Sequence, residues 1–149
     1  MKTIVLNQRK ERDELLSRPY LTRRSSQDFD TLLISHLIKL ITGPRRVGKS
    51  TQALLMLRDK NFAYLNFDSQ PLLNAWDANL VMRMLDDVYP GYDYLLLDEV
   101  QNLDVWDMWV SELYRQGKNQ VITGSNAKML SSEMATVLTG KYLQVEMLP

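Results

Sequence analysis

The sequence predicts an α/β fold, in which a five-stranded parallel sheet is flanked by helices and preceded by a short helical segment. From residue 37 onward, apolar segments typical of strands alternate with segments of helical periodicity, a pattern that indicates parallel strands joined by helical crossovers. The segment Tyr94–Leu97 is continuously apolar, as expected of a strand buried on both faces. The length of 149 residues fits one domain of ordinary size.

The expected elements follow in order along the chain. Before residue 37 the pattern predicts two short helices, Gln8–Arg18, which Pro19 ends, and Asp28–Ser35. The predicted strands are Leu37–Thr42, Phe62–Phe67, Tyr94–Leu97, Gln120–Thr123 and Tyr142–Met147. The predicted helices between the strands are Lys49–Arg58, Asn79–Val88, Asp104–Gln116 and Lys128–Leu138. We therefore expect a helical N-terminal segment at 1–36 and an α/β core at 37–149.

The composition excludes several classes of protein. The 18 basic and 18 acidic side chains cancel, which argues against a protein that wraps nucleic acid; contact with DNA through a local patch stays possible but unsupported. The lack of cysteine excludes a disulfide scaffold, a thiolate zinc site and thiol catalysis, and it suits a cytoplasmic protein. His36 is the single histidine, so a Ser-His-Asp triad is not expected. No apolar run of the sequence approaches the roughly 20 residues of a membrane helix.

A glycine-bracketed loop follows the first predicted strand. It matches the pattern G-x-x-x-x-G-K-[ST] in full, with the residues Gly43, Pro44, Arg45, Arg46, Val47, Gly48, Lys49 and Ser50. The glycines permit close approach of the backbone, whose N–H groups cradle phosphate oxygens, and the start of the following helix adds partial positive charge. Lys49 is expected to reach the β- and γ-phosphates, and Ser50 to ligate Mg²⁺. Thr51 is a weaker candidate for a contact with the α-phosphate.

An acid pair ends the third predicted strand. Asp98 and Glu99 follow the apolar run at 94–97, and ligands of parallel α/β sheets bind at the carboxyl ends of the strands. We expect Asp98 to hold Mg²⁺ through its water shell, because Mg²⁺ is held by a few carboxylates together with waters and phosphates. We expect Glu99 to polarise the attacking water as a general base. A pair of acids that only ends a strand is the alternative, and the upstream phosphate loop argues against it.

A third polar strand end follows at Gly124-Ser125-Asn126. If the strand before it neighbours both other motifs, Ser125 or Asn126 is placed to sense the γ-phosphate or to orient water. The same residues also suit a turn followed by a helix N-cap. The two interpretations are compatible, and both stay open.

Several segments, in order along the chain, together resemble one family. They are ITGPRRVGKST, YLLLDEVQN followed by Trp106, VITGSNAKMLSSEMATVLTGKY and the terminal VEMLP. They closely resemble the AAA-superfamily ATPases of bacteria and archaea, which pair an N-terminal ATPase core with a C-terminal nuclease-like domain. The resemblance spans about Leu37 to Pro149. It implies a P-loop NTPase fold of AAA type with the strand order 5-1-4-3-2, in which the strand containing Ile122 lies between the phosphate-loop strand and the Asp98 strand.

The same resemblance assigns roles to residues. It implies that Lys49 and Ser50 bind phosphate and Mg²⁺, that Asp98 and Glu99 are the metal-site and catalytic acids, and that Ser125 and Asn126 form a sensor. It also implies ATP rather than GTP as the nucleotide, and the absence of an N-K-x-D motif agrees with this.

The sequence departs from the family pattern in two places. Where the family usually has L-T-G-R, this chain has Leu138-Thr139-Gly140-Lys141, and a lysine lacks the planar fork with which arginine stabilises transferring charge. Hydrolysis is therefore expected to be slow if that position acts on the phosphate. The family also continues past the final proline, so we expect a core from which the C-terminal domain is missing.

Mg²⁺-dependent binding and hydrolysis of ATP is the function that these motifs favour. Three alternatives stay open: a nucleotide-gated interaction module that binds ATP without efficient turnover, a DNA-linked ATPase, and a small P-loop phosphotransferase. Self-association is expected if a neighbouring subunit supplies an arginine, for which Arg45, Arg46 and Arg115 are candidates.

Overall fold

The computed structural model describes residues 1–19, 30–44, 48–125 and 138–146. Its centre is a five-stranded sheet with the order β2-β3-β4-β1-β5, in which every neighbouring pair is parallel. The strands are β1 (Ile38–Thr42), β2 (Phe62–Asn66), β3 (Tyr94–Asp98), β4 (Gln120–Gly124) and β5 (Tyr142–Glu146). This order confirms the predicted one, including the position of β4 between β1 and β3.

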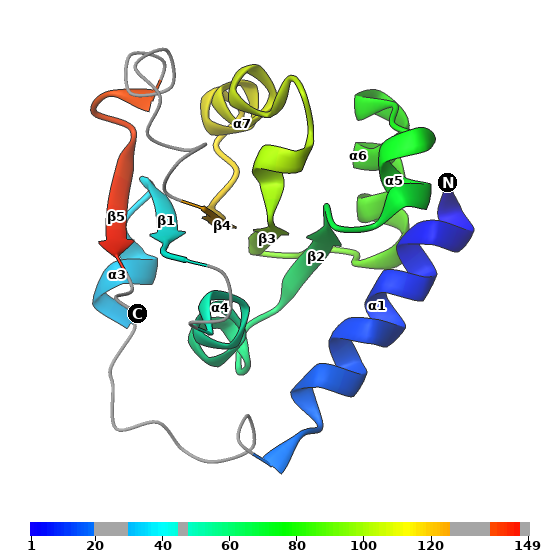
Figure 1. Ribbon diagram of the computed structural model, residues 1–149, viewed down its shortest axis with the longest axis horizontal. Helices are drawn as coiled ribbons and strands as arrows, with labels where there is room; N and C mark the ends of the chain where they lie inside the picture. Colours follow the sequence, from blue (N-terminus) through cyan, green and yellow to red (C-terminus); the bar gives the residue numbers. More distant parts are fainter. Residues whose placement is uncertain (20–29, 45–47, 126–137, 147–149) are drawn as a thin grey trace.

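Helices connect the strands and cover the sheet. They are α1 (Lys2–Leu16), α3 (Asp30–Ile34), α4 (Lys49–Leu57), α5 (Gln70–Asn74), α6 (Ala78–Val88), the 3₁₀ turn η1 (Val100–Asn102) and α7 (Trp106–Arg115). Figure 1 shows α5, α6 and α7 on one face of the sheet, α3 and α4 on the other, and α1 beside β2. The predicted helix at 128–138 lies outside the described residues except for its last position.

Three helical segments differ from the prediction. Helix α1 begins at Lys2 and not at Gln8, because Val5 is fully buried in the core and extends the apolar face of the helix toward the N-terminus. The short elements α5 and η1 were not predicted. Helix α5 has only five residues and depends on a local cap, in which Ser69 Oγ accepts a hydrogen bond from the backbone N–H of Leu72. Such short elements carry too little periodicity to be recognised in a sequence.

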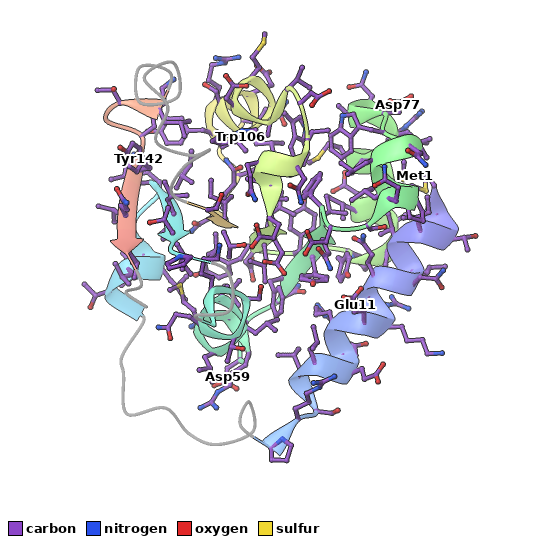
Figure 2. The ribbon with its side chains drawn as sticks, in the orientation of Figure 1. Met1, Glu11, Asp59, Asp77, Trp106 and Tyr142 are labelled. Carbon is purple, nitrogen blue, oxygen red and sulfur yellow. The ribbon has the colours of Figure 1, made fainter. Side chains whose placement is uncertain are left out.

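The two faces of the sheet bury separate apolar clusters. Leu40, Leu65 and Leu97 point toward α5, α6 and α7, whereas Ile41 and Leu96 point toward α3 and α4. Side chains that alternate along each strand therefore fill both layers. Figure 2 shows the side chains packed between these layers, with Glu11 on α1 along one side of the molecule and Tyr142 on β5 along the other.

Helix α1 covers the free edge of β2. The amide of Gln8 donates to the backbone oxygen of Asn66 at 3.0 Å and accepts from the backbone N–H of the same residue at 3.1 Å. One turn further on, Arg12 Nη1 donates to the backbone oxygen of Phe62 at 2.6 Å. An uncovered edge strand exposes such unpaired groups, so α1 completes the sheet where another strand would otherwise pair. The division of the chain at residue 36 stays a prediction.

The parallel strands bring their carboxyl ends to one edge of the sheet. In register, Asn66 of β2 lies beside Asp98 of β3, and Thr42 of β1 lies beside Gly124 of β4. The glycine-bracketed loop, the acid pair and the residues after β4 therefore all leave the sheet at this edge.

Candidate functional site

The glycine-bracketed loop joins β1 to α4. Gly43 is buried and Pro44 exposed, while Arg45, Arg46 and Val47 lie outside the described residues. Gly48 is the N-cap of α4 and has φ 84°, a left-handed conformation that glycine adopts without steric penalty. Helix α4 then presents the backbone N–H groups of its first turn to the carboxyl edge of the sheet, as an anion site at a helix start requires.

Ser50 and Asp98 meet at this edge. The hydroxyl of Ser50 lies 2.8 Å from Oδ1 and 3.0 Å from Oδ2 of Asp98, so it donates to the carboxylate. Residues 48 positions apart in the chain are thereby joined, because α4 starts beside the end of β3. The two residues predicted to share the metal site are in direct contact.

Asp98 is a buried carboxylate, and no basic side chain among the described residues forms an ion pair with it. Burial raises the pKa of the Asp98 carboxyl, and hydrogen bonds from Thr123 and Ser50 oppose this shift only in part. A buried anion without a counter-charge favours the approach of a cation. Hard oxygen ligands from one carboxylate and one hydroxyl are those that Mg²⁺ takes from a protein when phosphates and waters supply the rest. The residues present therefore fit Mg²⁺.

Lys49 and Glu99 form an ion pair next to this contact. Nζ of Lys49 lies 3.3 Å from Oε1 of Glu99, and both side chains are largely enclosed. Within the described part of the chain, Nζ of Lys49 makes no hydrogen bond, although an ammonium group carries three donors. A phosphate oxygen is an acceptor that this buried donor lacks.

Glu99 has an unusual backbone. It is the one residue other than glycine with positive φ in the described part of the chain, at φ 54° and ψ 45°. This left-handed conformation turns the chain from β3 into η1 and is disfavoured for a residue with a Cβ atom. Strained residues of this kind cluster at functional sites.

Two residues at the site were missed by the sequence analysis. Thr123 is fully buried; its hydroxyl donates to Oδ1 of Asp98 at 2.6 Å and accepts from the backbone N–H of Glu99 at 2.9 Å. Gln101 donates from Nε2 to Oε2 of Glu99 at 2.6 Å. The available signal was a threonine at the end of a predicted strand and a glutamine two residues after the acid pair.

The remaining site predictions have mixed outcomes. Ser125 is half-buried and directly follows β4, but the side chain that joins β4 to the acid pair is Thr123. Thr51 is half-buried on α4, one residue beyond Ser50. Asn126 lies outside the described residues. The sensor and α-phosphate roles of these three residues stay predictions.

Lys141 is not positioned to act on the phosphate loop of its own chain. It precedes β5, whereas the loop follows the carboxyl end of the adjacent parallel strand β1, and a five-residue strand spans about 16 Å. Nζ of Lys141 donates to Ser111 Oγ at 3.2 Å and lies 6.0 Å from the ring of Tyr114. Within one chain the condition for an effect of Lys141 on transferring charge is therefore not met, because the residue lies at the opposite edge of the sheet. The expectation of slow hydrolysis stays a prediction.

The candidate Arg115 and the partly buried ring of Trp76 both have structural contacts. Arg115, in the last turn of α7, forms an ion pair with Glu112. Trp76 packs against Phe67 and Trp109, at ring-centroid distances of 5.5 and 4.8 Å. Trp76 is therefore part of the packing on the face covered by α5, α6 and α7.

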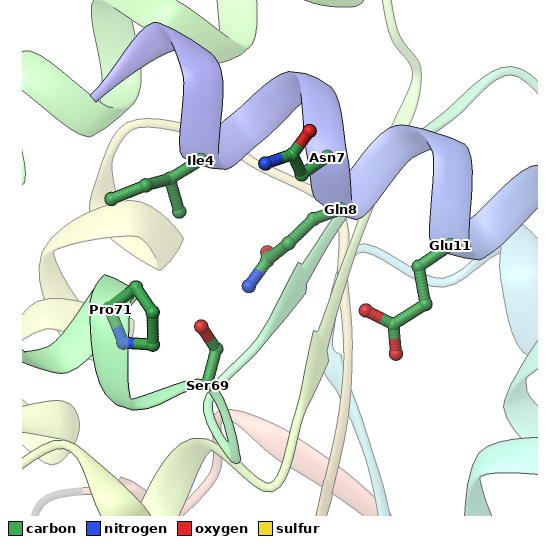
Figure 3. A pocket seen from close by; sticks show the side chains of 6 residues that line it. All are labelled: Ile4, Asn7, Gln8, Glu11, Ser69 and Pro71. Atoms are coloured by element: carbon green, nitrogen blue, oxygen red, sulfur yellow. The ribbon is translucent and has the colours of Figure 1, made fainter.

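A separate pocket of about 160 Å³ lies between α1 and the start of α5. Figure 3 shows its lining, with α1 on one side and the residues at the start of α5 on the other. The lining residues are Ile4, Asn7, Gln8, Glu11, Ser69 and Pro71. None of them belongs to the predicted nucleotide site.

Among the residues that the structure describes, no group of three or more His, Cys, Asp or Glu side chains is arranged to hold a metal ion. Among the same residues, no helix is both long and apolar enough to cross a membrane.

Comparison with known proteins agrees with this geometry. A family model described as AAA domain matches residues 35–149. The chain is 37% identical over 130 residues to MJ1544, an uncharacterized protein of Methanocaldococcus jannaschii, covering 83% of this chain and 29% of that protein. It is 36% identical over 125 residues to an uncharacterized protein of Haemophilus influenzae, covering 75% of this chain and 31% of that protein. The chain thus spans less than a third of the length of these curated relatives.

Solved structures are similar at lower identity. The structure of RIF2 from Saccharomyces cerevisiae has a TM-score of 0.51 at 18% identity, covering 98% of this chain and 61% of that chain. The P-loop NTPase domain of the sigma-54 transport activator from E. coli has a TM-score of 0.47 at 15% identity, covering 97% and 94%. At these identities the likeness to RIF2 concerns the fold alone.

Proposed function

The chain belongs to the AAA domain family, and we propose on this premise that it binds ATP with Mg²⁺ and hydrolyses ATP to ADP and phosphate. The observation that carries the proposal is the meeting of two distant motifs. Ser50 Oγ lies 2.8 Å from Asp98 Oδ1, and the adjacent residues Lys49 and Glu99 face each other at 3.3 Å. The choice of ATP over GTP rests on the family resemblance.

The residues divide the work of the reaction. Lys49 and the backbone N–H groups at the start of α4 would hold the phosphates, and Ser50 and Asp98 would hold Mg²⁺. When bound, Mg²⁺ supplies positive charge that neutralises the charge on the phosphates. Glu99 would accept a proton from the attacking water as general base. Catalysis of this kind is mostly positioning and electrostatic stabilisation.

The ion pair between Lys49 and Glu99 must open before the reaction. While the two charges are paired, Lys49 is not available to bind a phosphate and Glu99 is not available to accept a proton from water. A phosphate group competes for Lys49, because a phosphate oxygen supplies the acceptor that Nζ lacks among the described residues. Nucleotide binding would therefore release the Glu99 carboxylate for its role as a base.

The experiment that tests the proposal compares the wild type with Lys49→Ala and Glu99→Gln. ATP affinity is measured by calorimetry with Mg²⁺, and phosphate release is measured separately. We expect the wild type to bind and hydrolyse ATP, Lys49→Ala to lose affinity, and Glu99→Gln to bind ATP but release phosphate at least 100-fold more slowly. An absence of ATP binding by the wild type would contradict the proposal.

A nucleotide-gated interaction module is the second candidate function. The observation that favours it is the same ion pair, because its opening would change the surface around η1 even without hydrolysis. This candidate predicts that the wild type binds ATP without releasing phosphate. Under the first proposal, Glu99→Gln alone shows that behaviour.

A further inference from the structure

Gln101 contacts the residue that the proposed reaction uses as its base. It lies in η1, two positions after Glu99, and is only 8% exposed. Its Nε2 donates to Oε2 of Glu99 at 2.6 Å, while Oε1 of Glu99 faces Lys49 at 3.3 Å. One oxygen of the Glu99 carboxylate therefore faces the charged Lys49, and the other accepts a hydrogen bond from the uncharged side chain of Gln101.

The orientation of the Gln101 amide follows from this contact. An ionised carboxylate can only accept hydrogen bonds, so the nitrogen of the amide must face Glu99 and the oxygen must point elsewhere. That oxygen, Oε1 of Gln101, is buried and has no hydrogen-bond donor among the described residues. Buried acceptors are normally paired, and an unpaired one calls for an explanation.

Two buried polar groups that make no hydrogen bond therefore lie beside Glu99, within the described part of the chain. Lys49 Nζ is held there by charge alone, at 3.3 Å from Oε1 of Glu99, and Gln101 Oε1 is a buried acceptor without a donor. A phosphate oxygen would satisfy the first group. The second group needs a molecule that donates, and a water molecule beside Glu99 can donate one hydrogen to each of two acceptors.

We propose that Gln101 positions the attacking water: its Nε2 orients the Glu99 carboxylate, and its Oε1 accepts one O–H of the water while Glu99 faces the other. This inference rests on the proposed ATP hydrolysis. Residues that orient the nucleophilic water recur in phosphoryl-transfer enzymes, because little covalent chemistry is left for the protein to do.

The proposed step transfers the γ-phosphoryl group from ATP to water. The water oxygen forms a bond to the γ-phosphorus, and the bond from that phosphorus to the β–γ bridging oxygen breaks, with its electron pair leaving on ADP. One water proton moves to the Glu99 carboxylate and later to solvent. The other O–H, held by Gln101, remains on the phosphate product. Gln101 itself exchanges no proton.

The test compares two buried glutamines. Gln101→Met removes the donor and the acceptor at similar length. Gln120→Met is the matched control, because Gln120 is also buried and its Oε1 also makes no hydrogen bond within the described part of the chain. Gln120, however, lies at the start of β4 and donates to the backbone oxygen of Val110. The readouts are kcat for phosphate release, Kd for ATP by calorimetry, and Tm.

We expect Gln101→Met to lower kcat at least tenfold and to change the Kd for ATP less than twofold. Gln120→Met is expected to leave both values within twofold of the wild type, whatever its effect on Tm. In the Glu99→Gln background, Gln101→Met is expected to cause no further loss, because both residues act on the same water. A merely structural role would add the two losses.

The outcomes separate the two proposals. If the wild type hydrolyses ATP and Gln101→Met keeps kcat within twofold, the role of Gln101 is overturned and the proposed function stands. If the wild type releases no phosphate, the proposed hydrolysis fails first and the role of Gln101 fails with it. If Gln101→Met does not fold, Gln101→Glu is used. It keeps the shape but places like charges together, so a wild-type kcat in this variant would also overturn the role.

Discussion

The hydroxyl of Thr123 lies 2.6 Å from Oδ1 of Asp98 and donates a hydrogen bond to it inside the protein. The same hydroxyl oxygen accepts the backbone N–H of Glu99 at 2.9 Å. One side chain at the end of β4 thus contacts both acids at the end of β3. Asp98 and Glu99 are therefore held in position by β4 as well as by β3. Their position depends on β4 being the neighbour of β3 in the sheet.

Replacing Thr123 by valine removes this link at nearly unchanged shape. The Asp98 carboxylate loses a donor and the Glu99 N–H loses its acceptor, so Thr123→Val is expected to lower the free energy of unfolding by about 2 kcal/mol. Its Mg²⁺-dependent affinity for ATP is expected to fall as well. Thr123→Ser keeps the hydroxyl and loses one methyl group, which costs about 1 kcal/mol, and it should keep the affinity. Urea denaturation and calorimetry measure the two effects; equal affinities for both variants would contradict the prediction.

Much of the fold could be predicted from local patterns. Each strand is short and contains apolar residues, and the apolar run at 94–97 is buried almost throughout, as β3 shows. The buried face of a helix follows less directly from the sequence. Met108 on α7 is 69% exposed although it is apolar, because α7 turns Trp106, Trp109 and Val110 inward. An error of one position rotates a helix face by about 100°, and only the packed sheet determines which face is buried.

The site could be predicted where a motif has a strict spacing. The contact between Ser50 and Asp98 follows from two motifs, because one lies at the start of α4 and the other at the end of β3. Thr123 and Gln101 have no such spacing, and their roles depend on which strands are neighbours and on the turn that follows Glu99. Lys141 illustrates the same limit, because its place at the amino edge of β5 follows from the sheet and not from its neighbours in the sequence.

The contact of Gln8 with the free edge of β2 can be tested by a substitution that exchanges the side-chain amide for a carboxylate. Gln8→Glu replaces the donor Nε2 by an acceptor that faces the backbone oxygen of Asn66, with which Gln8 now bonds at 3.0 Å. We expect a loss of about 1–3 kcal/mol in the free energy of unfolding. Asn7→Asp makes the same chemical change at an exposed position of the same helix and should stay within about 0.5 kcal/mol of the wild type. Equal losses in urea denaturation would show that the edge contact does not stabilise α1.

Lys39 should make stability depend on pH. The residue is fully buried on β1, where it donates to Asn119 Oδ1 at 2.7 Å and to the backbone oxygen of Ser35. Burial lowers the pKa of Lys39 from 10.5 to about 8. Between these two values the unfolded chain binds more protons than the folded one, so the free energy of unfolding rises with pH, by at most about 1.4 kcal/mol per pH unit.

The measurement is a series of urea denaturations from pH 7.5 to 9.5, compared with Lys39→Met and with the exposed control Lys10→Met. The rise should be present in the wild type and in Lys10→Met, and absent in Lys39→Met. The range ends below pH 10 because burial raises the pKa of Tyr89 to about 12. The unfolded chain then loses its tyrosine proton first, which lowers stability at higher pH. If the free energy of unfolding still rises with pH in Lys39→Met, the pH dependence belongs to other groups and the prediction is wrong.

The variant Asp98→Asn distinguishes the destabilisation caused by the buried charge of Asp98 from the contribution of that charge to ligand binding. Burial raises the pKa of Asp98, so at neutral pH the folded protein holds a carboxylate whose charged form is disfavoured, and this penalty decreases as pH falls through the folded pKa. Asparagine removes the charge at the same shape, and its oxygen can still accept the hydrogen bonds from Ser50 and Thr123. Without nucleotide, the variant is therefore expected to be more stable than the wild type by about 1 kcal/mol. With Mg²⁺ and ATP the order is expected to reverse, because only the wild type gains stability from bound ligand.

Asp93→Asn, at an exposed carboxylate just before the same strand, should follow the wild type in both conditions. Thermal unfolding with and without Mg²⁺ and ATP measures these differences, and a ligand-induced rise in Tm of Asp98→Asn equal to that of the wild type would remove Asp98 from the metal site.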